Sequence, residues 1–265
     1  MAVTSRPLPS AQSVRAAEVV REIAIGGLAG LVGGLLVVGV GGRLFMCFVT
    51  LIDTSSIGTL TSNGNRIGDI TLGGTLGFMV FGGLLFGGCA GVLWAAVSQW
   101  LPGRGAGRAL ASRVVAVASF FVARADERDF LVLDPPGASV AMLVMIVAAL
   151  GVVIALADDR LRRVLPATDP VSPWSSGYLA VLCLGLVLVP ITLAAYFGTS
   201  DPPAAVGAAL LVVGGNTTLW WAARIRHGRS RVPVAMTVVA SIALLVAVSL
   251  GLVRLATEIS LIVAT

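Results

Sequence analysis

The chain has 265 residues, of which 57% are hydrophobic and only 12% are charged, and its mean hydropathy is +0.98. A soluble globular domain carries about 25% charged residues, so this composition predicts a multi-pass membrane protein. The net charge of +5 comes from 18 basic residues, all of them arginine. At this hydropathy a basic balance indicates contact with an anionic inner leaflet, and it argues against a nucleic-acid partner.

Seven apolar segments follow a polar lead, residues 1–22. The first apolar run is too long for a signal peptide, so we expect it to be retained and the lead to be a cytoplasmic segment. A bilayer core needs about 20 apolar residues per helix. Residues 23–265 are therefore expected to form one transmembrane domain. The candidate spans are residues 23–52, 70–97, 109–122, 138–157, 177–197, 204–223 and 233–253.

The third segment is short and contains Arg113, and the distribution of arginine tests whether it crosses. If all seven segments cross with the N-terminus inside, thirteen arginines lie inside and four outside, with Arg43 in or near the membrane. If the third segment does not cross, nine arginines lie inside and eight lie outside. The positive-inside rule favours seven spans, with the N-terminus inside and the C-terminus outside.

Glycine recurs at every fourth position in the first two spans. Gly26, Gly30 and Gly34 form one series, and the segment "GGLLFGGCAG" (82–91) repeats the pattern. On a helix this spacing lines one face with hydrogen atoms, which lets two backbones approach closely. We expect these spans to pack against each other or against a neighbouring span; a permeation path lined by glycine is the alternative.

The connection "TLTSNGNRIGDITLGG" (59–74) contains an Asn-Gly flanked by alternating apolar and polar residues, a strong signal for a β-hairpin. The second outer loop, residues 123–137, alternates in the same way before Asp134 and a Pro-Pro. We expect the outer loops 53–69 and 123–137 to form a small hairpin-like cap, in which Arg66 meets Asp69, Asp53 or Asp134. The alternative is two solvated loops that do not touch.

Several chemistries are excluded by composition. A retinal Schiff base needs a lysine, and the chain has none; with a single histidine, His227, it cannot form a bis-histidine haem site or a histidine-rich metal site. The carboxylates all fall at span ends or in loops, which argues against proton pumping. No nucleotide-binding or hydrolase motif is present. We therefore expect no enzyme activity, no cofactor and no metal.

Two polar features remain inside the predicted spans. Arg43 is expected either to reach the outer interface or, if buried, to need a carboxylate or an anionic ligand such as a lipid phosphate. Asn216, in "GGNTTLWW" (214–221), is expected to hydrogen-bond a neighbouring helix or to line a binding site.

At "GNRIGDITLGGTL" (64–76) and "RDFLVLDPPGASVAML" (128–143) the chain resembles a group of integral membrane proteins of high-GC actinobacteria for which no activity is known. The resemblance implies a membrane location and assigns no functional residue.

These features together predict an all-α, non-enzymatic protein of the bacterial plasma membrane. It is expected to be an accessory or scaffolding component whose outer face binds a membrane-protein partner or a lipid headgroup. The candidate contact residues are Arg43, Asp53, Arg66, Asp69, Asp134 and Asn216. The alternative is a small-solute transporter or channel lined by Arg43 and Asn216, and a lipid-modifying enzyme comes third.

Overall fold

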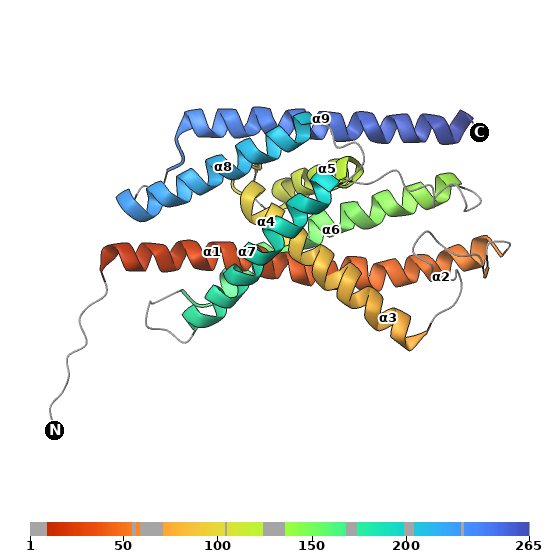
Figure 1. Ribbon diagram of the computed structural model, residues 1–265, viewed down its shortest axis with the longest axis horizontal. Helices are drawn as coiled ribbons and strands as arrows, with labels where there is room; N and C mark the ends of the chain where they lie inside the picture. The colour runs from red at the N-terminus through yellow and green to blue at the C-terminus, as the bar shows by residue number, and fades with distance from the viewer. Residues whose placement is uncertain are drawn as a thin grey trace, which may run out of the picture.

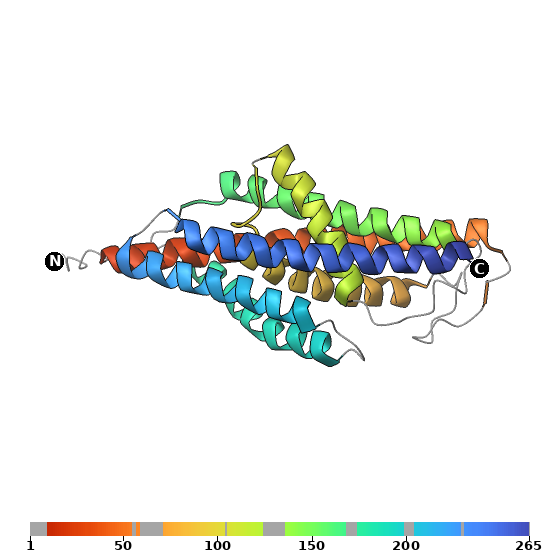
Figure 2. The same cartoon turned by 90° about the horizontal axis from the view of Figure 1, so that it is seen from above.

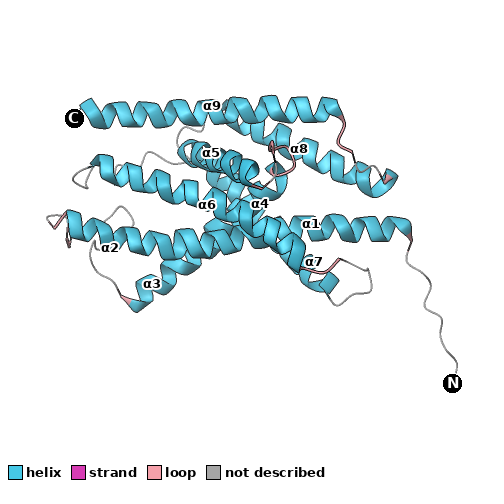
Figure 3. Cartoon of the chain, turned by 180° about the vertical axis from the view of Figure 1, so that it is seen from behind, coloured by secondary structure: helices cyan, strands magenta, loops and turns pink. Residues whose placement is uncertain are grey.

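The computed structural model describes residues 10–54, 57–58, 71–103, 105–123, 136–167, 174–198, 204–228 and 231–264. Within these ranges the chain is helical and contains no strand (Figure 3). The elements in chain order are α1 (Ala11–Gly33), η1 (Gly34–Gly41), α2 (Gly42–Ile52), α3 (Leu72–Phe78), η2 (Met79–Leu85), α4 (Phe86–Val97), α5 (Ala106–Ala123), α6 (Pro136–Val164), α7 (Trp174–Gly198), α8 (Ala204–His227) and α9 (Val234–Ala264).

The η elements are π-helical segments inside two longer helices. The series α1–η1–α2 is one continuous helix, and α3–η2–α4 is another, so the described part contains seven continuous helices. Each predicted apolar segment coincides with one of them. The predicted all-helical fold is therefore confirmed for the described residues.

The first helix is longer than its apolar run. It begins at Ala11, twelve residues before residue 23, because Ser10 caps it: the Ser10 hydroxyl accepts a hydrogen bond from the Ser13 amide at 3.2 Å. Its 42 residues from Ala11 to Ile52 span roughly 60 Å at about 1.5 Å per residue. That is about twice the thickness of a bilayer core.

Five of the continuous helices are long and apolar enough to cross a membrane. They contain the stretches Ala11–Ile52, Leu72–Val97, Val140–Val164, Ala204–His227 and Val234–Thr257; a shorter apolar stretch, Ser175–Leu188, lies in α7. Large apolar side chains face outward along them, with Leu72 79%, Leu219 65% and Leu245 65% exposed. Such surfaces are costly in water, so these helices fit a membrane protein.

The first two continuous helices meet along glycine, as their spacing predicts. We call Gly30, Gly34, Gly87 and Gly91 the glycine seam. A Cβ atom built on Gly87 would lie 2.7 Å from the Gly30 carbonyl oxygen, and one on Gly91 would lie 2.8 Å from the Gly27 carbonyl oxygen. Both contacts are with rigid backbone, so the approach requires glycine. The expectation that the two spans pack against each other is confirmed.

The bundle is organised around α1, which contacts α4, α6, α7 and α8. In Figure 1, α1 and α9 run along the long axis, and α3 diverges from α2 beyond η1 and η2. Figure 2 shows that the start of α1 and the end of α9 lie at opposite ends of the molecule. Several helix ends lie toward the end of the bundle where α1 begins: the C-terminal ends of α4, α6 and α8 and the N-terminal end of α5. This arrangement builds the site described next.

Candidate functional site

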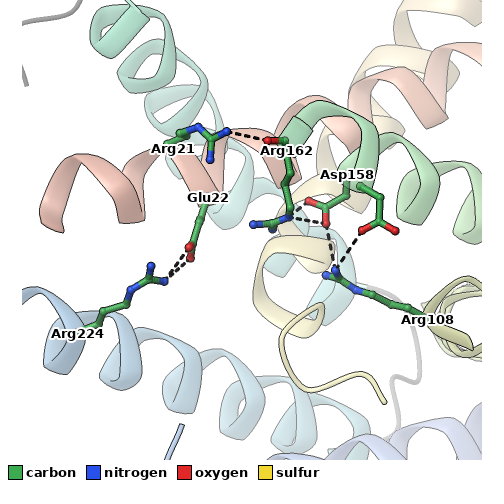
Figure 4. Close-up of polar contacts among 7 residues, drawn as sticks. Arg21, Glu22, Arg108, Asp158, Arg162 and Arg224 are labelled. Atoms are coloured by element: carbon green, nitrogen blue, oxygen red, sulfur yellow. Dashed lines mark hydrogen bonds and ion pairs between the residues drawn. The ribbon is translucent and has the colours of Figure 1, made fainter. Parts of the chain in front are cut away.

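Charged residues from four helices meet near the N-terminal half of α1 (Figure 4). We call this group the ionic cluster; its members are Arg21 and Glu22 of α1, Arg108 of α5, Asp158 and Arg162 of α6, and Arg224 of α8. These residues come from segments that lie far apart in the sequence. Their contacts hold the helix ends together at one end of the bundle.

Asp158 is the centre of the cluster on α6, and it is completely buried. Its two carboxylate oxygens accept hydrogen bonds from Arg162 Nε at 3.0 Å and Arg162 Nη2 at 3.1 Å, one helical turn away. Arg108 Nη1 lies 3.4 Å from Asp158 Oδ2 and 3.8 Å from Asp159 Oδ1. Two guanidinium groups therefore compensate the buried carboxylate, as burial of a charge requires.

Arg21 closes the C-terminal end of α6. Its Nε donates to the Pro166 carbonyl at 2.8 Å, and its Nη2 donates to the Leu165 carbonyl at 2.7 Å and the Arg162 carbonyl at 3.1 Å. The last carbonyls of a helix lack intrahelical partners and carry partial negative charge, so an arginine there is stabilising. The Tyr178 hydroxyl of α7 also donates to Pro166.

Arg224 joins α8 to α1. Its Nη1 donates to both carboxylate oxygens of Glu22, at 2.8 and 2.7 Å, and its Nη2 lies 3.7 Å from a Glu18 oxygen. Its guanidinium also lies over the Trp220 ring, 5.5 Å from the centroid. Arg108 packs in the same way over Trp94, at 5.0 Å. Cation–π contacts of this kind hold both arginines against the bundle.

A cavity of about 380 Å³ opens among these side chains. This volume falls within the ~300–1,000 Å³ of typical ligand sites. Three arginines, one glutamate, one glutamine and two tryptophans supply most of its polar and aromatic wall. The full lining is Glu22, Ala95, Ser98, Gln99, Leu101, Gly103, Arg108, Arg162, Trp220, Trp221 and Arg224.

Hydrogen-bond donors in this wall lack partners. Gln99 Nε2, Arg108 Nε and Trp220 Nε1 are buried, and none of them bonds an acceptor in the described part of the chain. Trp94 Nε1, beneath Arg108, is in the same situation. The wall therefore contains hydrogen-bond donors that have no matching acceptor among the described residues.

The predicted site residues that are described lie elsewhere. Arg43 is half-buried at the point where α2 and α3 diverge, with its guanidinium 5.4 Å from the Phe78 ring centroid and its Nη1 3.6 Å from Met46 Sδ. Its Nε is buried without a hydrogen-bond partner, and no carboxylate of the described residues pairs with it. Asp53 is buried at the end of α2. Arg66, Asp69 and Asp134, together with the predicted hairpin and cap, lie outside the described residues.

Asn216 contacts a neighbouring helix, as one of the two interpretations predicts. Its Nδ2 donates to the Met236 carbonyl of α9 at 3.4 Å. The next residue, Thr217, is buried and accepts from Trp100 Nε1 at 2.7 Å while donating to the Ala96 carbonyl at 2.7 Å. The segment 214–221 therefore ties α8 to α9 and to the end of α4.

Arg43 and Asn216 lie at different places in the bundle. Arg43 packs between α2 and α3, Asn216 packs between α8 and α9, and the cavity beside the ionic cluster is lined by neither residue. A transport path lined by these two residues stays a prediction.

The ionic cluster was missed at the level of sequence. The basic balance of the chain indicates contact with the inner leaflet and does not reveal that Arg162 pairs with Asp158, four residues away on one helix face. That spacing was a usable signal. The partners from other helices, Arg21, Arg108 and Arg224, have no local signal, since they are set by how the helices pack.

No group of three or more potential metal ligands occurs among the described residues. A comparison with protein-family models found no family that matches the chain, and comparisons with curated proteins and with solved structures found no significant match.

Proposed function

We propose that the chain is a non-enzymatic, multi-pass protein of the bacterial plasma membrane that acts as an accessory or scaffolding component by binding a partner protein or a lipid. The observation that supports this most is the ionic cluster. It joins α1, α5, α6 and α8 at one end, while the helices beyond it expose apolar side chains. Helix ends tied in this way suit a fixed framework better than a moving gate.

In this proposal α5 and α7 cross together with the five long apolar helices, giving seven crossings. The 18 residues of α5 span roughly 27 Å, close to the thickness of a bilayer core. The side chain of Arg113 on α5 is exposed, so it can extend to the headgroups. The arginine distribution then places the N-terminus and the ionic cluster inside and the C-terminus outside.

The outer loops are the proposed partner surface. Asp53 is buried where the first of these loops begins. Arg66, Asp69 and Asp134 complete the candidate contact residues on that side. Charged loops beside a membrane recognise a partner through complementary charge.

Purification in mild detergent followed by native mass spectrometry tests the scaffolding role. We expect a partner protein or lipid to be retained in a fixed ratio to the chain. The double variant Arg66→Ala/Asp69→Ala should lose a partner held at the outer face, whereas Arg226→Ala on α8, on the proposed inner side, should retain it. A lone monomer without bound protein or lipid would contradict the proposal.

A further inference from the structure

The lining of the cavity beside the ionic cluster contains more basic than acidic side chains. Arg108, Arg162 and Arg224 all line it, and Glu22 is the one acidic residue in its lining. Asp158 lies behind Arg108 and Arg162 and does not line the cavity. Of the carboxylates that compensate the arginines, only Glu22 therefore faces the interior, and it is held by Arg224 at 2.7 Å.

Several hydrogen-bond donors around the cavity also have no acceptor to bond. Each polar atom of its lining that is buried without a partner in the described structure is an N–H donor: Gln99 Nε2, Arg108 Nε and Trp220 Nε1. A buried donor without an acceptor destabilises the fold. A negatively charged acceptor in the cavity, with a small rotation of these side chains, would relieve that destabilisation. A cation or a neutral donor would not.

The arginines approach from three different helices, α5, α6 and α8. A planar carboxylate matches one guanidinium fork, whereas a phosphate presents oxygens in several directions and can meet more than one arginine. The wall also carries Trp220 and Trp221. Tryptophan is enriched at the depth of lipid headgroups, where phosphate is abundant. Basic pockets between membrane helices bind anionic headgroups on the cytoplasmic side.

We propose that this cavity is a binding site for a phosphate group, held by Arg108, Arg162 and Arg224 and supplied either by the headgroup of an anionic membrane lipid or by free phosphate. The site deepens the proposed function, since a lipid ligand rests on the inside orientation of the ionic cluster. The phosphate chemistry itself does not depend on that orientation.

Glu22 gives the proposal its sharpest test, because it opposes an anion. Glu22→Gln removes the one carboxylate of the lining and frees Arg224. Phosphate affinity, measured by isothermal titration calorimetry of the purified full chain in detergent, should rise severalfold. A residue that served only to fix α8 on α1 would give lower affinity or no change when altered. The control Glu18→Gln, at 3.7 Å from Arg224 and outside the lining, should change the affinity little.

Variants that remove a donor should lower the affinity for phosphate. Arg224→Gln should weaken phosphate binding about tenfold or more, the size expected for one charge-assisted contact. Arg226→Gln, on the same helix but exposed and outside the lining, should leave it unchanged. Gln99→Leu removes an unmet donor, so it should fold at least as well as the natural chain and still bind phosphate more weakly.

The source of the phosphate is decided by two parallel measurements at equal ionic strength. In the first, inorganic phosphate is titrated against chloride as a control. In the second, native mass spectrometry follows the lipid retained from nanodiscs of phosphatidylcholine with or without phosphatidylglycerol. Retention of phosphatidylglycerol by the natural chain and its loss in Arg224→Gln would assign the site to a lipid headgroup.

Saturable binding of inorganic phosphate without retained anionic lipid would assign the site to free phosphate. Binding of neither probe, or binding that Glu22→Gln and Arg224→Gln leave unchanged, would overturn the proposal. Those results would not affect the scaffolding role, which is tested by retention of a partner at the outer face.

Discussion

Asp158 and Thr217 are buried polar residues, and each has a partner outside its own helix. Asp158 is matched by arginines of α5 and α6, and the Thr217 hydroxyl joins Trp100 to the end of α4. A buried polar group stabilises a fold only when its partners are present. Substitution of either residue should therefore lower the stability of the protein. The next residue in each case serves as a control whose substitution should have little effect.

Replacing the buried carboxylate should be strongly destabilising. Asp158→Asn leaves Arg108 and Arg162 without their shared charge, and breaking such a buried pair costs about 3 kcal/mol or more. We expect a clear fall in the thermal unfolding temperature of the detergent-solubilised protein. Asp159→Asn, whose carboxylate is partly exposed and 3.8 Å from Arg108, should cause only a small change. Equal effects of the two substitutions would contradict the role given to Asp158.

The Thr217 hydroxyl should be required for a stable contact between α8 and the end of α4. Thr217→Val keeps the shape of the side chain but leaves Trp100 Nε1 without its acceptor, at a cost of about 1–3 kcal/mol in the free energy of unfolding. Thr218→Val is the matched control, because that hydroxyl is exposed and bonds only the Gly214 carbonyl of its own helix. Chemical denaturation in mixed micelles measures both. The prediction is wrong if the two variants unfold alike.

These pairings were only partly predictable. The spacing of Asp158 and Arg162 predicts a contact on one helix face. Asn216 was expected either to hydrogen-bond a neighbouring helix or to line a binding site, and it contacts α9. The pairing of Arg108 with Asp158 could not be predicted from the sequence, since it depends on where α5 lies against α6. A side chain's own helix sets the local contacts, but tertiary packing sets the rest.

Among the helices, the packing of α1–η1 against η2–α4 is the contact that the sequence specified best. Glycines four residues apart predicted a close approach of backbones, and the glycine seam shows it. The π-helical segments η1 and η2, which face each other along this contact, were not predicted. A hydrophobic pattern made of glycine and aliphatic residues does not distinguish a π-helix from an α-helix. The start of α1 at Ala11 was also not predicted, because this capped part of the helix lies within the polar lead.

A methyl group in the glycine seam should separate these helices. Gly34→Ala would place its Cβ against the backbone of Gly83 and Gly87, which cannot move aside as a flexible side chain could. Overpacking of this kind typically costs about 1–3 kcal/mol. Thermal unfolding in detergent should show the loss. Gly214→Ala on α8, where nothing lies within 4 Å of the added atom, should be neutral or slightly stabilising.

For the molecule as a whole, apolar length and charge give complementary information. The five long apolar helices fit a membrane protein, and the ionic cluster gathers helix ends at one end of the bundle. Helix α5, whose first half carries Arg108 and Arg113, is the element on which the number of crossings depends. With seven crossings the exposed end of α8 and the far end of α9 lie on opposite sides of the membrane.

Site-directed labelling of cysteine tests this orientation most directly. Cys47, Cys89 and Cys183 are first replaced by serine, and Arg226→Cys or Thr257→Cys is then introduced at an exposed position. A membrane-impermeant maleimide should label position 257 in intact spheroplasts. It should label position 226 only after lysis. Labelling of both positions before lysis, or of position 226 alone, would contradict a seven-crossing bundle with its ionic cluster inside.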